Sequence, residues 1–151
     1  MPGLWRLYRS KYGPGLDGIG GTFAEGRWHA QGNRIVYFGA SAAIVVLERL
    51  AHADADLLPR DLRLGYFEYP EALSSVKVDT VAALTRNWIE SESATRQIGT
   101  NWLQAGASCL LFVPSAILPE ESNVVFNPQH PEAESIRLVR ERPFSFDPRL
   151  I

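Results

Sequence analysis

The chain has 151 residues, of which 46% are hydrophobic and 11% aromatic, and this length and composition fit a single globular domain over residues 1–151. Its formal net charge of −2 lacks the basic excess of a general nucleic-acid binder, so we expect no direct nucleic-acid binding. No apolar stretch approaches transmembrane length and the first ten residues hold no signal-peptide core, so we expect a cytoplasmic protein without a membrane partner.

The first part of the chain predicts two strands and a helix around a glycine-rich loop. Residues 4–8 and 34–38 have the apolar, aromatic character of strands. Residues 11–26 are rich in glycine and predict a loop between the strands. Ser41 is then placed to cap a helix that should run to about residue 53.

The rest of the chain predicts interleaved strands and helices. The expected strands are 64–69, 75–78, 109–113, 123–126 and 135–140. Two helices are expected: a short one over 79–87, capped by Asp79, and one from Ser91 or Ser93 to 105, closed by Gly106. The tail 143–151 should pack through Phe144, Phe146 and Leu150. This order predicts an α+β fold with a mixed or largely antiparallel sheet and flanking helices.

The chain offers neither a disulfide framework nor a metal site. Cys109 is the one cysteine, and its apolar neighbours predict a buried structural thiol rather than a nucleophile. The histidines His29, His52 and His130 are scattered without the spacing of metal ligands. We therefore expect no metal ion.

Glu48 is the most informative residue, because it directly follows the apolar run 42–47 on a helix expected to be buried. A carboxylate removed from water is costly unless it is paired or hydrogen-bonded, and Arg6 and Arg27 are the expected partners. Such an acid can stabilise a cationic transition state or bind a ribose hydroxyl when a glycosidic bond breaks. A salt bridge to Arg49, Arg6 or Arg27 at the edge of the core is the alternative, and the residues alone leave both open.

Four more residues are candidates for binding a ligand: three lie before the second expected strand and one lies within it. The Arg27 guanidinium can bind phosphate or carboxylate through two bonds, and the neighbouring Trp28 indole can stack on a flat ring. The alternative is a surface cation beside a core tryptophan. His29 and Tyr37 could serve the same pocket, or be a structural histidine and a half-buried sheet tyrosine.

Two polar residues follow later strands. Ser115 comes just after the strand expected to end before Pro114, without the glycine-flanked elbow of serine hydrolases, so it either caps a turn or binds a ligand phosphate or amide. Asn127 precedes Pro128 in a rigid polar loop, where asparagine is typical of a turn.

Taken in order, these segments resemble the RES-domain family, the toxins of RES–Xre toxin–antitoxin modules. The resemblance lies in Trp5-Arg6, residues 26–29 with Gly32, Val36-Tyr37, and residues 42–48, 98–103, 113–116, 123–128 with His130-Pro131, and 143–150. Each stretch is short, but the ordered set spans nearly the whole chain.

The resemblance implies an ADP-ribosyltransferase-like fold and an enzyme that depletes NAD+ by hydrolysis or phosphorolysis of the nicotinamide–ribose bond. NAD+ would be the substrate, inorganic phosphate a co-substrate in phosphorolysis, and no cofactor is expected. Carried over by position, the catalytic residues are Arg6, Glu48 and Ser115, and the substrate-binding residues are Arg27, Trp28, His29, Tyr37 and Asn127. His29 departs from the family, which usually has asparagine there.

The resemblance also implies partners. An Xre-type helix-turn-helix antitoxin is expected to block the pocket, and the toxin is expected to form a homodimer within the complex. Two other functions stay open: transfer of ADP-ribose to a protein, as at least some relatives do, and a domain that binds a nucleotide or partner without turnover.

Overall fold

The computed structural model describes residues 1–52, 58–78 and 86–151. Within them lie seven strands, two α-helices and several short 3-10 turns. The expected end of the first helix near residue 53 and most of the short helix expected at 79–87 lie outside the described residues.

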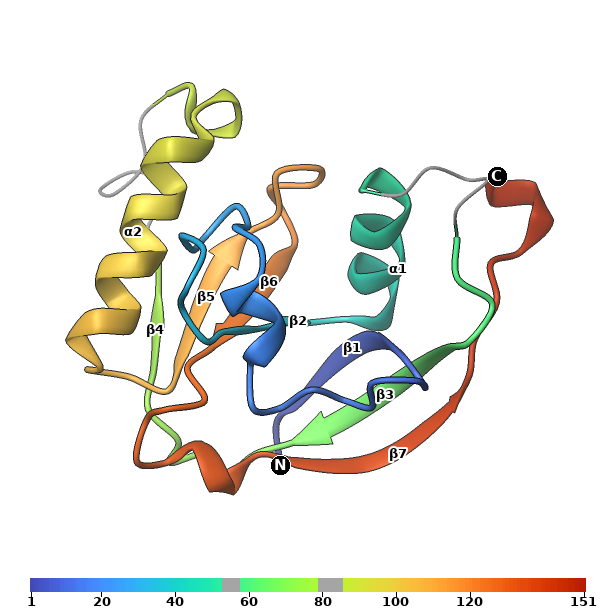
Figure 1. The fold of residues 1–151 in the computed structure, drawn as a ribbon, viewed down its shortest axis with the longest axis horizontal. Coiled ribbons are helices and arrows are strands. Elements are labelled where there is room, and N and C mark those ends of the chain that lie inside the picture. The colour runs from blue at the N-terminus through green and yellow to red at the C-terminus, as the bar shows by residue number, and fades with distance from the viewer. Residues whose placement is uncertain (53–57, 79–85) are drawn as a thin grey trace.

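The strands form one mixed sheet in the order β4-β5-β6-β2-β1-β3-β7 (Figure 1). Their bounds are β1 Gly3–Arg9, β2 Val36–Gly39, β3 Leu62–Glu68, β4 Ser75–Lys77, β5 Leu110–Pro114, β6 Ser122–Phe126 and β7 Arg137–Pro143. Among these strands β4 and β5 are parallel, and every other neighbouring pair is antiparallel. The predicted α+β fold with a mixed, largely antiparallel sheet is confirmed.

The sheet is joined weakly at its middle. Strands β1 and β2 share a single paired position, Trp5 with Gly39, whereas β1 and β3 pair along their full length. The sheet therefore has a four-stranded half (β4, β5, β6, β2) and a three-stranded half (β3, β7 and β1). The halves meet in the main core, where the Phe38 ring lies edge-on 5.0 Å from Phe67 and 6.1 Å from Phe126.

Helix α2, Glu92–Ala105, covers a second core on the four-stranded half. Trp102 of the helix packs against this core, which includes buried Trp28 and Val125. The helix ends at Gly106, whose left-handed backbone (φ 63°) lets its N–H bond the Trp102 carbonyl. The predicted glycine cap is confirmed.

Helix α1, Ala42–Ala51, lies beside β1 and β2 (Figure 1). The Ser41 hydroxyl accepts the Ile44 N–H at 3.2 Å, which confirms the predicted cap. Ile44 is the one fully buried residue of this helix, and Glu48 is half-buried with 22% of its side chain exposed. The expectation of a buried helix was therefore wrong: α1 flanks the sheet instead of entering the core.

Several strand bounds differ from the prediction because backbone pairing, rather than side-chain pattern, decides them. The last strand begins at Arg137, after a 3-10 turn at Ala133–Ser135, and extends to Pro143 because it pairs with β3. In the tail, Phe144 and Phe146 pack edge-to-face at 5.1 Å. Leu150 is 54% exposed, so the prediction that it packs was wrong.

The remaining sequence expectations concern single sites. Cys109 is fully buried, and burial raises the pKa of its thiol to about 12, as expected of a structural cysteine. Within the described residues, no helix has the length and apolar character needed to span a membrane. The same residues contain no group of three metal-ligating side chains.

Candidate active site

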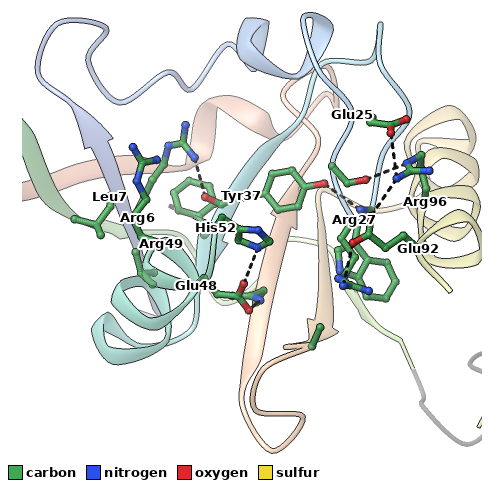
Figure 2. A pocket seen from close by; sticks show the side chains of 16 residues that line it. Arg6, Leu7, Glu25, Arg27, Tyr37, Glu48, Arg49, His52, Glu92 and Arg96 are labelled. Carbon is green, nitrogen blue, oxygen red and sulfur yellow. Dashed lines mark hydrogen bonds and ion pairs between the residues drawn. The ribbon is translucent and has the colours of Figure 1, made fainter. Parts of the chain in front are cut away.

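A pocket of about 490 Å³ opens between α1, strands β1 and β2, and the loop before β2 (Figure 2). Five of the eight candidate residues line it: Arg6, Arg27, Trp28, Tyr37 and Glu48. The other three, His29, Ser115 and Asn127, do not. Residues far apart in the sequence thus converge on one cavity, with Glu48 near its middle in Figure 2.

The Glu48 carboxylate is held by two uncharged side chains and lies near a histidine. Its Oε1 accepts hydrogen bonds from Ser115 Oγ and Asn123 Nδ2, both at 2.7 Å. Its Oε2 lies 3.4 Å from His52 Nε2, one helical turn later. The expectation that Arg6 and Arg27 pair with Glu48 was wrong, because α1 turns this side chain toward the start of β6 and the turn after β5. The carboxylate lines the pocket and forms no ion pair with an arginine among the described residues.

Ser115 orients Glu48 without reaching the pocket. The hydroxyl is fully buried, donates to Glu48, and accepts the N–H groups of Ile117 at 3.1 Å and Leu118 at 3.2 Å. It therefore caps the turn after β5, as one reading of the sequence proposed, and at the same time positions the acid. Its catalytic assignment stays a prediction, and these contacts favour a positioning role.

For the NAD+ cleavage that the family resemblance implies, replacing Ser115 with alanine should lower kcat by about tenfold, because the carboxylate loses one of its two close donors. The KM for NAD+ should change little, since Ser115 does not line the pocket. Steady-state kinetics on folded protein measure both, with exposed Ser93→Ala as the control. A rise in KM at unchanged kcat would show that Ser115 binds substrate instead.

Asn123 and His52 were not identified as site residues from the sequence, yet both line the pocket. His52 lies four residues after Glu48, and that helical spacing was a usable signal. Asn123 is 75 residues from Glu48 in the chain, and no local pattern marks it.

Tyr37 and His29 form a locked pair. His29 Nε2 lies 2.9 Å from the Ala24 carbonyl oxygen and 3.1 Å from that of Gly21, so we assign its proton to Nε2. Nδ1 then accepts the Tyr37 hydroxyl at 2.7 Å, and the Trp28 N–H donates to the same hydroxyl oxygen at 3.1 Å. Burial raises the pKa of Tyr37 well above its usual value. His29 is thus a buried residue that fixes the Tyr37 ring and does not line the pocket.

Replacing Tyr37 with phenylalanine should reduce the free energy of unfolding by about 1–3 kcal/mol, since the Trp28 N–H and His29 Nδ1 lose a buried partner. Urea denaturation measures the loss. Tyr12→Phe is the matched control, because Tyr12 is 70% exposed. Equal stabilities of the two variants would contradict the locked pair.

Two sequence candidates have mainly structural surroundings. Trp28 is 2% exposed and packs against Trp88 with ring centroids 6.4 Å apart, so little of its indole can stack on a ligand. Asn127 is buried, and its Oδ1 accepts the Gln129 N–H at 3.1 Å. Asn127 does not line the pocket, because it follows the end of β6, whereas Asn123 near Glu48 is the second residue of that strand, roughly 13 Å away at about 3.3 Å per residue. Its expected substrate contact stays a prediction.

The pocket has two differently charged ends (Figure 2). At one end Arg27 donates to the Ile89 carbonyl at 3.0 Å and to Glu92 at 3.3 Å, while Arg96 lies 3.4 Å from both Glu25 and Glu92. At the other end Arg6 and Arg49 form no ion pair within the described residues. Uncompensated positive charge therefore lies at the Arg6 end, and Glu48 lies between the two ends.

This fold and pocket define an α+β domain able to hold an anionic ligand against a fixed carboxylate. The chain belongs to the RES domain family, whose model matches residues 3–147, and the expected resemblance is confirmed.

Similar proteins cover nearly the whole chain. It is 37% identical to the Prs ADP-ribosylating toxin of Sphingobium sp. (strain YBL2), over 98% of this chain and 96% of that protein. It is 38% identical to Toxin Res of Pseudomonas putida, over 97% of this chain and 98% of that protein. A chain in the crystal structure of the M. tuberculosis MbcT–MbcA toxin–antitoxin complex superposes with a TM-score of 0.76. The match covers 95% of this chain and 84% of that chain, and at 17% sequence identity it shows a shared fold.

Proposed function

We propose that this chain is the toxin of a toxin–antitoxin pair and that it cleaves the nicotinamide–ribose bond of NAD+. Membership of the RES family and two relatives named as toxins support the toxin role. The observation that carries the chemistry is the Glu48 carboxylate, fixed by Ser115 and Asn123 in a pocket with arginines at both ends.

The reaction breaks the bond between the nicotinamide nitrogen and the ribose anomeric carbon. Nicotinamide leaves with the bonding electrons as a neutral molecule, and positive charge develops on the ribosyl group. A fixed carboxylate stabilises that charge more in the transition state than in the ground state, which lowers the barrier. Glu48 is proposed for this task, and it would also orient the ribose hydroxyls.

Water or inorganic phosphate then forms the new bond to the anomeric carbon. Water yields ADP-ribose and releases one proton, and phosphate yields ADP-ribose carrying a phosphate on that carbon. Arg6 is proposed to bind the pyrophosphate, and the fixed Tyr37 ring is proposed to form one wall for nicotinamide. Arg27 has bonds to Ile89 and Glu92, so it is proposed to shape the far end of the pocket.

Product analysis tests this function. Purified protein, folded and free of antitoxin, is incubated with NAD+ with and without phosphate, and nicotinamide and ribosyl products are separated by chromatography. Nicotinamide should appear in at least one condition, and the partner product identifies the acceptor. Absence of nicotinamide in both conditions would refute NAD+ cleavage.

Transfer of ADP-ribose to a protein is the second candidate, favoured by the 37% identical relative named as an ADP-ribosylating toxin. It predicts a mass gain on a target protein in place of free ADP-ribose. NAD+ binding by calorimetry without any product would instead favour a domain that binds nucleotide without turnover.

Partner binding is proposed on the same grounds. The similar fold in the MbcT–MbcA complex supports an antitoxin partner, and an Xre-type protein that covers the pocket is the proposed form. A homodimer of the toxin and a cytoplasmic location stay predictions. Co-expression with a neighbouring helix-turn-helix protein, followed by copurification and loss of toxicity, tests the antitoxin.

A further inference from the structure

The uncompensated end of the pocket brings together two arginines from different elements. Arg6 extends from β1 and Arg49 from α1, and both line the cavity. Figure 2 shows their side chains next to each other, on the opposite side of Glu48 from Arg27 and Arg96. Arg49 directly follows Glu48 in the chain, so one helical turn supplies both a carboxylate and a guanidinium to the same cavity.

Arg6 is held in place by groups that do not neutralise it. Its Nε donates to the Pro14 carbonyl at 2.9 Å and its Nη1 to the Tyr37 carbonyl at 2.8 Å. Carbonyl oxygens orient a guanidinium but leave its net charge intact. Burial, and then the nearby Arg49 charge, lower the pKa of Arg6 to about 10, so it stays protonated at neutral pH while repelling its neighbour.

Arg49 also carries unused binding capacity. Its Nε is buried and forms no hydrogen bond within the described chain. A buried donor without a partner is costly, and two close cations add to that cost. An anion bound against the two guanidiniums would offset the repulsion between these cations.

The opposite end of the pocket provides the contrast. Arg27 and Arg96 are also close together, but Glu92 contacts both and Glu25 contacts Arg96. An anionic ligand gains less there, because these cations already have carboxylate partners. The Arg6 end is therefore where a ligand with more than one negative group gains the most.

We propose that Arg49 is a second guanidinium of a diphosphate subsite shared with Arg6, and that it makes the pocket select nucleoside diphosphates over monophosphates. Each planar guanidinium matches the oxygens of one phosphate through paired hydrogen bonds. The inference rests on the proposed function and deepens it. It assigns binding of the substrate's diphosphate to Arg49, which is not one of the catalytic candidates Arg6, Glu48 and Ser115.

Direct binding tests the subsite without any turnover. Calorimetry compares ADP, AMP and adenosine on the wild-type protein and on Arg49→Gln, Arg49→Lys and Arg137→Gln. Arg137 is exposed on β7 and outside the pocket lining, so its variant controls for loss of one positive charge.

ADP affinity should fall about 10- to 100-fold in Arg49→Gln, the loss expected for hydrogen bonds to charged groups. AMP affinity should fall less, adenosine affinity should be unchanged, and Arg137→Gln should match the wild type. Arg49→Lys should recover part of the ADP affinity, because it restores the charge without the planar fork.

Three results would overturn the subsite: no ADP binding by the wild-type protein, unchanged ADP affinity in Arg49→Gln, or an equal loss for all three ligands. The outcome is separate from the test of NAD+ cleavage. A selective loss of ADP binding in a protein that releases no nicotinamide would support the subsite and refute the proposed activity. Nicotinamide release by a protein whose ADP affinity does not depend on Arg49 would support the proposed activity and refute the subsite.

Discussion

Replacing Glu48 with glutamine should lower nicotinamide release from NAD+ by about 100- to 1,000-fold, the usual loss when a preorganised electrostatic group is removed. The amide keeps the oxygen that accepts from Ser115 and Asn123. The variant should therefore fold like the wild type and lose only the negative charge that faces the pocket. Nicotinamide release at saturating NAD+ measures the effect.

Glu120→Gln is the control for this experiment, because Glu120 is an exposed acid outside the pocket lining. Circular dichroism and a urea titration should show both variants folded with equal midpoints. If folded Glu48→Gln protein retains wild-type activity, Glu48 has no part in the chemistry, and the catalytic group must be sought among the other lining residues.

Replacing Gly99 with alanine should cost about 3 kcal/mol or more of folding free energy, at the upper end for overpacking. A Cβ added at Gly99 would lie 1.7 Å from the Trp28 carbonyl oxygen and 2.7 Å from its carbonyl carbon. Helix α2 thus packs directly on the Trp28 backbone, and the helix or the strand-side loop must move. A thermal melt should show a decrease of roughly 6–12 °C for a domain of this size.

Gly20→Ala is the matched control, since an added Cβ there has no neighbour within 4 Å. Its stability should stay within about 0.5 kcal/mol of the wild type. A Gly99→Ala melt equal to that of Gly20→Ala would mean that α2 does not contact Trp28 as closely as described. Because Arg27 precedes Trp28, the Gly99 variant should also lose NAD+ turnover where it remains folded.

Local sequence signals predicted much of the fold. Ser41 and Gly106 were identified as helix caps because capping depends on a few neighbouring residues, and both cap in the structure. The strand positions were predicted within two or three residues, since runs of apolar side chains follow buried sheet. The bounds were less certain because pairing partners, such as β3 for β7, are distant in the chain.

The candidate site was predicted only in part, for a related reason. Glu48 attracted attention because an acid beside an apolar run is locally unusual. Its partners Ser115 and Asn123 lie 67 and 75 residues away, and only the register of β5 with β6 brings them to α1. Asn127 was a candidate because its place in a polar loop was visible in the sequence, whereas the end of β6 that faces the pocket, with Asn123, was not.

The single paired position between β1 and β2 has a consequence for which mutations the protein can tolerate during evolution. Arg6 belongs to one half of the sheet, and Tyr37 and Asn123 belong to the other, so few sheet hydrogen bonds set the width of the pocket. The Arg6–Tyr37 bond and the contact of Phe38 with Phe67 hold the halves together. Phe67 is fully buried and does not line the pocket, yet mutations there should therefore alter the geometry of the pocket as well as stability. Selection for activity therefore also constrains core residues that set the width of the pocket.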